Sequence, residues 1–149
     1  MALFGCAIVL AEYAYAAMEP DNVIEVVSQA AAECRSMGGR PNTEAMLSVD
    51  DLNGDGGEDW IIDFSKLRCA GSPNPFCGSG GCSLQIFLWS QGSVWISVFD
   101  GVVQKYRLLR FQQRRAIELT MRGEGCEKSK AGVCHRRFFF GSTALVPIQ

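Results

Sequence analysis

One short stretch of the chain carries oxygen-bearing side chains at the spacing that calcium sites use. It runs from Asp51 to Asp59 and places Asp51, Asn53 and Asp55 at alternate positions. Ca²⁺ takes about six to eight oxygen ligands, and side chains at positions 1, 3 and 5 of a turning loop can point at one centre. Position 6 is a glycine, which suits the sharp turn needed there. The sequence therefore predicts a Ca²⁺ site whose ligands are Asp51, Asn53, Asp55, the Gly57 carbonyl and Asp59.

The segment resembles calcium loops of the D-x-[DN]-x-D-G type. Position 12, where an EF-hand has a bidentate Glu, is Ile62, and the flanking residues are typical of strands. The following Trp60-Ile61-Ile62-Asp63 makes the stretch resemble an FG-GAP repeat of integrin-type propellers. Only one copy is present, and a propeller needs several blades, so the resemblance extends to the loop and not to the fold. The alternative is a metal-free turn, because Asn53-Gly54 and Asp55-Gly56 are both strong turn dipeptides.

Residues for catalysis are sparse, and we predict none. His135 is the only histidine, and its neighbour Cys134 is expected to be oxidised, which excludes a Cys–His nucleophile pair. No nucleophile-elbow, phosphate-loop or zinc-protease motif occurs. The cysteine spacings also lack the paired C-x2-C pattern of structural zinc sites.

The elements that would position the loop are one helix and a series of strands. Apolar residues at helical spacing predict a helix from about Pro20 to Met37, ended by Gly38-Gly39. Strands are expected at Ala45–Val49 and Trp60–Phe64, followed by a Leu84–Phe99 hairpin that turns at Ser90–Ser93. A second turn is expected at Asp100-Gly101. The strands after it are expected at Val102–Leu109, Ala116–Arg122, Val133–Phe140 and Ala144–Ile148. We predict an α+β fold: one N-terminal helix packed on an antiparallel meander or sandwich of about seven strands.

The cysteines predict a disulfide framework. Of the seven, Cys6 lies in an apolar N-terminal segment, which leaves six. An even number fits an oxidising compartment. Local spacing suggests that Cys126 pairs with Cys134, Cys77 with Cys82, and Cys34 with Cys69. An alternative joins Cys69 to Cys82 and Cys34 to Cys77.

The first 17 residues are typical of a signal peptide. Ala2–Ala11 is an apolar run, and Ala14-Tyr15-Ala16 is an A-x-A cleavage pattern just before Ala17. The run is too short to span a bilayer, which needs about 20 residues. We therefore expect a signal peptide at residues 1–17, a single domain at residues 18–149, no transmembrane segment, and a periplasmic or secreted location.

Charge is divided unevenly along the chain. Residues 1–64 hold 12 acidic and 2 basic side chains, whereas residues 65–149 hold 4 acidic and 12 basic ones. One interpretation is a basic face for an anionic envelope component. The other is that the two halves neutralise each other across the fold, which the formal net charge of −2 favours. We do not expect a nucleic-acid partner, because the aromatic residues are explained by a sheet core.

Over its whole length the chain resembles small exported proteobacterial proteins with a DLNGDG loop and paired C-terminal cysteines. The resemblance implies no activity. The leading hypothesis is an exported binding or structural module with one calcium-stabilised loop. A periplasmic hydrolase inhibitor similar to lysozyme inhibitors, using the segment Ser72–Gly81 to contact its target, is the second. A hydrolytic enzyme with a site around His135 is the third.

Overall fold

The computed structural model describes residues 21–90, 94–126 and 132–149. The predicted signal peptide and most of the predicted Ser90–Ser93 turn lie outside these ranges. In chain order the elements are α1 (Asp21–Ser36), β1 (Arg40–Asn42), β2 (Leu47–Asp50), β3 (Asp59–Asp63), β4 (Arg68–Ala70), β5 (Cys77–Gly78), β6 (Gly81–Ser90), β7 (Val94–Val103), β8 (Lys105–Phe111), β9 (Arg114–Arg122), β10 (Val133–Phe140) and β11 (Leu145–Pro147). Short 3₁₀ turns lie at Glu44–Met46, Phe64–Lys66 and Gly123–Cys126.

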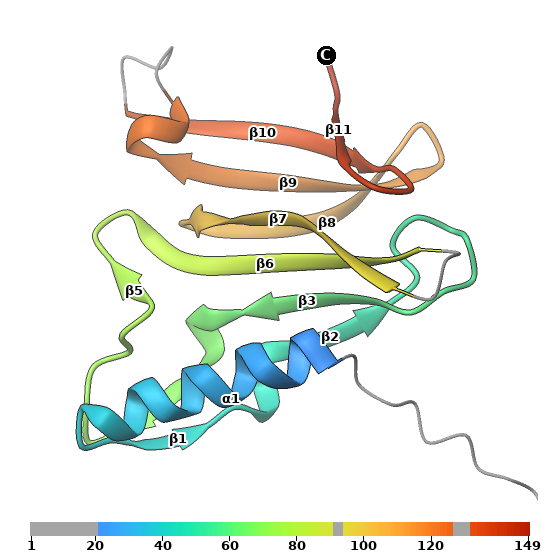
Figure 1. Cartoon of the computed structure of the whole chain (residues 1–149). Helices are drawn as coiled ribbons and strands as arrows, with labels where there is room; N and C mark the ends of the chain where they lie inside the picture. Colours follow the sequence, from blue (N-terminus) through green and yellow to red (C-terminus); the bar gives the residue numbers. More distant parts are fainter. Residues whose placement is uncertain (1–20, 91–93, 127–131) are drawn as a thin grey trace, which may run out of the picture.

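The strands form two main antiparallel sheets (Figure 1). One has five strands, in which β2, β3, β6 and β5 follow one another and β7 pairs with β6. The other has four strands in the order β11, β10, β9, β8. A small ladder of β1 and β4 accompanies the helix. The predicted α+β class, with one helix and antiparallel strands, is therefore confirmed.

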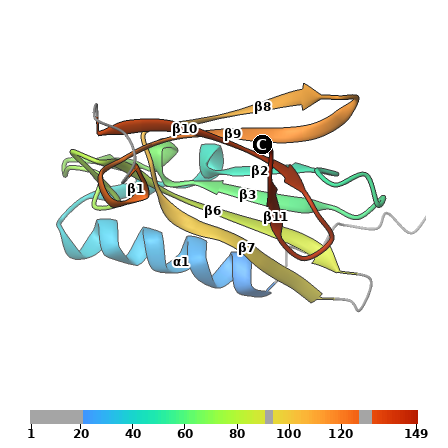
Figure 2. The same ribbon diagram turned by 90° about the horizontal axis from the view of Figure 1, so that it is seen from above.

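The five-stranded sheet is the middle layer of three (Figure 2). One face carries Trp60, Ile62 and Phe87, which are buried in one core cluster with Val23 and Ala30 of α1. The other face packs on the four-stranded sheet, and the second core cluster joins the two sheets through Ile61, Leu84, Ile86, Leu88, Ile117 and Leu119. Since side chains alternate along a strand, a middle strand with apolar residues on both faces fits this position. This is why β3 is buried along its whole length.

Three disulfides join elements of the structure. Cys34 of α1 is bonded to Cys69 of β4, Cys77 to Cys82, and Cys126 to Cys134. These are the pairs that local spacing suggests, and the alternative pairs Cys69–Cys82 and Cys34–Cys77 do not form. The helix ends as expected, because Gly38 has a positive φ of 81° and Gly39 N–H donates to the Cys34 carbonyl.

The predicted turn at Asp100-Gly101 is wrong. Strand β7 continues through both residues and ends at Val103, with Gly101 opposite Leu84 and Asp100 opposite Gln85. A β-bulge between Ile86 and Phe87 shifts the register of this hairpin, and the two strands then continue to Cys82 and Val103. Continued pairing with β6 satisfies the backbone groups of the Asp-Gly pair, so the turn preference of these residues is overridden.

No helix within the described ranges is long and apolar enough to cross a membrane. The segment Ser72–Gly81, considered as an inhibitory loop, is tied to the core. Asn74 donates from Nδ2 to the carbonyls of Phe64 and Leu67, and the Phe76 ring lies 4.7 Å from the Phe64 ring. These contacts do not test whether the segment inhibits a hydrolase, so the inhibitor hypothesis stays a prediction.

Candidate calcium-binding loop

The acidic loop connects two paired strands of the middle sheet. Asp50 and Asp59 are the last partners of the β2–β3 ladder, so residues 51–58 form the connection. Leu52 is buried in the core cluster between the sheets and anchors the loop from its second residue. On the other limb a Cβ on Gly57 would lie 2.3 Å from the Trp89 ring, so the backbone can approach β6 this closely only because residue 57 is glycine.

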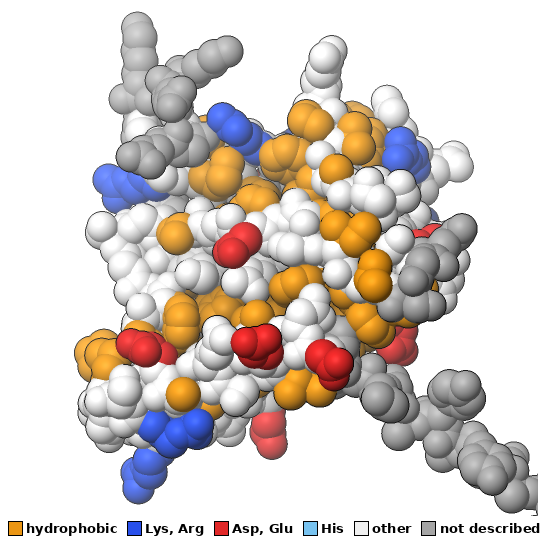
Figure 3. Space-filling model, in the orientation of Figure 1, with side chains coloured by type: hydrophobic (Ala, Val, Ile, Leu, Met, Phe, Trp, Pro, Cys, Tyr) orange, Lys and Arg blue, Asp and Glu red, His pale blue; other side chains and the backbone are white. Residues whose placement is uncertain are grey.

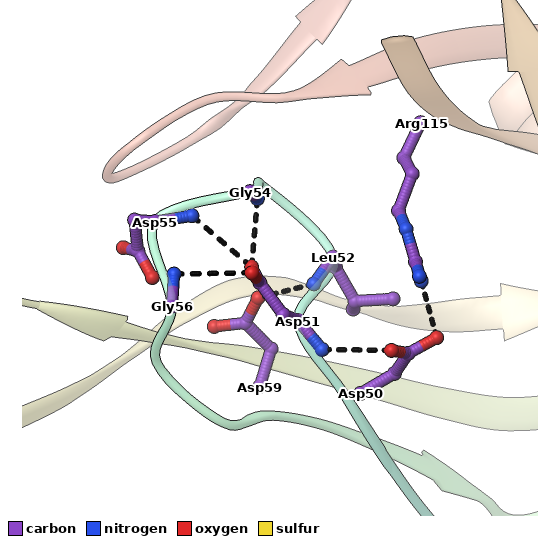
Figure 4. Close-up of polar contacts among 8 residues, drawn as sticks. All are labelled: Asp50, Asp51, Leu52, Gly54, Asp55, Gly56, Asp59 and Arg115. Carbon is purple, nitrogen blue, oxygen red and sulfur yellow. Dashed lines mark hydrogen bonds and ion pairs between the residues drawn. The ribbon is translucent and has the colours of Figure 1, made fainter.

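Asp51 organises the first half of the loop (Figure 4). Its Oδ1 accepts hydrogen bonds from the N–H groups of Gly54 (2.7 Å) and Asp55 (3.1 Å), and its Oδ2 accepts one from Gly56 (3.0 Å). Gly54 and Gly56 both have positive φ, 83° and 86°, a conformation that glycine adopts without strain. The carboxylate thus closes the turn around itself.

Asn53 and Asp55 brace each other. The Asn53 amide donates from Nδ2 to Asp55 Oδ2 (3.0 Å), and its Oδ1 accepts from the Asp55 N–H (3.0 Å). Asp55 Oδ1 accepts from the Gly57 N–H at 2.7 Å. In the view of Figure 4 the carboxylates of Asp51 and Asp59 lie within the arch of the loop, and that of Asp55 lies at its left side.

Asp59 is the buried member of the group, with 0% of its surface exposed. Its Oδ2 accepts from the Leu52 N–H (2.7 Å) and its Oδ1 from the Trp89 N–H (2.8 Å), so the side chain ties the loop to β6. Burial raises the pKa of Asp59, the backbone N–H groups of Trp89, Leu52 and Asn53 oppose this, and the Asp55 charge adds to the rise. No Lys or Arg among the described residues forms an ion pair with Asp59.

Arginines of the β8–β9 hairpin lie across from the loop. Arg115 forms an ion pair with Asp50, and this partner lowers the pKa of the Asp50 carboxyl. Arg110 and Arg115 face each other in the ladder and line one hollow together with Asp51 and Asn53. On the β6 side the loop borders a groove of about 550 Å³, lined by Asn53, Asp55, Trp89, Arg114, Ser142 and Thr143 among others.

Of the five predicted ligand residues, Asp51, Asn53, Asp55 and Gly57 lie in the loop and Asp59 is the first residue of β3. Within residues 21–90, 94–126 and 132–149, the structure gathers no group of three or more His, Cys, Asp or Glu side chains that could by itself hold a metal ion. Any ion here needs oxygens from Asn53 and the backbone as well. Carboxylate oxygens together offer about four lone-pair sites, and the contacts of Asp55 and Asp59 use two each. Acceptor capacity therefore remains on both.

The sequence did not reveal how Asp59 is held. Its anchor on β6, the Trp89 N–H, comes from a residue 30 positions away, and only the pairing of β3 with β6 brings the two together. Cys134 is bonded to Cys126 and so offers His135 no thiol nucleophile, whereas the hydroxyl of the buried Thr120 lies 3.0 Å from His135 Nδ1. Comparisons of this chain with protein-family models, with curated proteins and with solved structures find no match, so the geometry of the loop carries the functional argument.

Proposed function

We propose that this protein is an exported binding or structural module whose loop from Asp51 to Asp59 is held in shape by one Ca²⁺ ion. The observation that carries the proposal is Asp59: a fully buried carboxylate without a described cationic partner, next to the charge of Asp55. A buried charge is costly unless it is paired or coordinates a metal. A divalent cation among these oxygens would offset that cost.

The donor set fits calcium better than the other common cations. It consists of carboxylate and amide side-chain oxygens from Asp51, Asn53, Asp55 and Asp59, with the Gly57 carbonyl as a backbone ligand. Hard oxygen ligands in a flexible loop suit Ca²⁺, whereas Mg²⁺ demands stricter octahedral geometry. Water molecules would complete the shell. The expected role is structural, because the ion would join two strands of the middle sheet.

The three disulfides support export. Cross-links between cysteines persist in oxidising compartments and are rare where thiols are kept reduced. The A-x-A pattern ending at Ala16 supports cleavage before Ala17.

Thermal melting of chelator-treated protein with added CaCl₂ tests the loop. A site that binds the folded state stabilises it by mass action, and we expect a rise in Tm of about 5 °C at a Ca²⁺ concentration about tenfold above Kd. MgCl₂ at the same concentration should give a smaller rise.

Two variants make the test specific. Asp55→Asn keeps an acceptor for the Gly57 N–H and removes one ligand charge, so it should reduce the Ca²⁺-dependent rise. Asp100→Asn makes the same change at an exposed position of β7 and should leave the rise intact. An unchanged Tm of the wild-type protein at millimolar Ca²⁺ would mean that hydrogen bonds alone hold the loop.

A further inference from the structure

The outer face of the four-stranded sheet carries a row of basic side chains. Ile117, Leu119 and Met121 of β9 point into the core, so the residues alternating with them point outward. The register then brings Arg107, Glu118 and Arg137 into one row across β8, β9 and β10, and Lys105, Thr120 and His135 into the next. We call these six residues the basic face.

Glu118 fixes the two arginines of the basic face. Its Oε1 accepts from Arg107 Nη2 at 2.8 Å, and its Oε2 accepts from Arg137 Nε at 2.7 Å. The carboxylate is 12% exposed, whereas the arginine side chains are 68% and 50% exposed. One partly covered carboxylate thus orients two exposed guanidinium groups. Such prepositioned donors suit carboxylate, sulfate or phosphate oxygens.

Among the described residues, no side chain of the basic face forms an ion pair with the acidic half of the chain. Within the ranges that the structure describes, two ion pairs join residues 21–64 to the later part of the chain, Arg115–Asp50 and Lys66–Asp63, and neither includes a residue of the basic face. Glu118 is the only acidic side chain in the two rows. In the view of Figure 3, acidic side chains gather over α1 and basic ones lie over β9 and β10 and at one end of the helix. Most acidic side chains in this view therefore lie in the helix layer, away from the basic face.

A shallow pocket of about 500 Å³ continues the basic face toward the C-terminal end of the described chain. It is lined by Phe111, His135, Arg137 and Pro147 among others. His135 Nδ1 lies 3.0 Å from Thr120 Oγ1, so Thr120 fixes the ring and the other ring nitrogen is left for a ligand.

We propose that the basic face binds an anionic polysaccharide, with Arg107 and Arg137 contacting its carboxylate or sulfate groups and Lys105 and His135 its neighbouring oxygens. Charge complementarity and the arrangement of the cationic side chains in two neighbouring rows across β8, β9 and β10 favour a polymer with repeated anions. A nucleic acid fits less well, because no free aromatic ring lies among the six residues. Arg114 covers the nearby Phe139 ring at 4.2 Å, and Phe111 packs beside it.

A membrane surface also fits less well. Proteins that lie on membranes combine basic residues with apolar side chains that enter the acyl region. None of the six residues of the basic face is a large hydrophobic residue, and of the exposed ones in the described chain Val146, paired with Phe139 on the same sheet face, adjoins it.

Titration of fluorescently labelled heparin, a sulfated polysaccharide, tests the proposal in 50 mM NaCl with EDTA. Arg107→Gln and Arg137→Gln should each weaken binding about tenfold, as expected for loss of a charged hydrogen bond. Each should also lower the slope of log K against log salt by about one. Lys105→Gln, which disturbs no described ion pair, should weaken binding in the same direction.

The controls separate this site from general charge attraction. Arg35→Gln removes an exposed cation from α1 in the opposite layer and should change the affinity less than twofold. Because EDTA is present, a failed calcium titration does not affect this result. Equal binding by wild type and all three basic-face variants would overturn the proposal. So would equal or tighter binding of double-stranded DNA, or of vesicles containing phosphatidylglycerol, than of heparin.

Discussion

At the residue scale, Asp59 decides how the acidic loop responds to pH. Its pKa is raised above the ordinary value of 3.8, first by burial. The folded protein therefore holds the Asp59 proton more tightly than the unfolded chain does. The stabilisation from this group is complete below the unfolded pKa and is lost as the pH rises through the folded pKa.

We expect the unfolding free energy of the wild-type protein to fall relative to that of Asp59→Asn as the pH rises from below 3.8 to 7 in chelator. The loss amounts to about 1.4 kcal/mol for each unit by which the folded pKa exceeds the unfolded one. Urea denaturation at each pH measures it. Contributions of Asp50 and Glu118, whose pKa values are lowered, cancel in this difference because both proteins contain them.

Calcium should remove this loss, because a cation beside Asp59 stabilises the ionised form. Saturating CaCl₂ is therefore expected to give the wild-type protein a growing advantage over Asp59→Asn as the pH rises to 7. A wild-type advantage that already grows with pH in chelator would contradict the assignment of Asp59 as a carboxyl whose ionisation is opposed by burial.

At the element scale, local sequence patterns predicted the helix and the longer strands, whose residues repeat with a clear period. The expected helix from Pro20 to Met37 corresponds to α1, and the expected strand Val133–Phe140 has the bounds of β10. The very short strands β1, β4 and β5 were not predicted. Two or three residues give no periodic signal, and these strands exist because partners elsewhere in the chain pair with them.

The loop illustrates the same limit. Its residues and turning glycines could be predicted from spacing alone. The attachment of Asp59 to Trp89 and the packing of Gly57 on the Trp89 ring could not, since both depend on where β6 lies. The β8–β9 turn was equally hidden, because Gln112 and Gln113 adopt positive φ values of 49° and 62° without a glycine to signal them.

The disulfides should differ in what they contribute to stability. Cys34–Cys69 spans 35 residues and Cys77–Cys82 spans 5, so the first restricts the unfolded chain more. The chain-entropy model gives about 4 kcal/mol for the longer loop and about 2 kcal/mol for the shorter one. We expect the double substitution of Cys34 and Cys69 by Ala to lower the unfolding free energy more than that of Cys77 and Cys82.

Denaturant unfolding of the two double variants measures this order. Removing Cys34–Cys69 also releases α1 from β4, and it should expose the helix to proteolysis before the rest of the domain. A larger loss on removing Cys77–Cys82 would show that the segment Ser72–Gly81 contributes more to the fold than its length suggests.

At the scale of the whole molecule, apolar burial joins the layers and charge is divided between them. Ile61, Leu84 and Ile86 of the middle sheet pack on Ile117 and Leu119 of the outer sheet. Two ion pairs of the described residues join the acidic and basic halves: Asp50–Arg115, whose side chains are 48% and 40% exposed, and Asp63–Lys66, whose side chains are 11% and 46% exposed. Exposed ion pairs contribute about 0–1 kcal/mol. The balanced net charge therefore does not mean that the halves neutralise each other by contact.

A double-mutant cycle on Asp50→Asn and Arg115→Gln measures that contribution. We expect a coupling energy below about 1 kcal/mol at 50 mM NaCl, falling toward zero at 0.5 M NaCl as the charges are screened. Leu119→Ala, which removes buried contacts between the sheets, should cost about 2–5 kcal/mol at both salt concentrations. Salt should thus abolish polyanion binding to the basic face while leaving the fold stable. A coupling energy comparable to the cost of Leu119→Ala would instead mean that attraction between the two halves is a main force holding the layers together, and the basic face would then be less free to serve a partner.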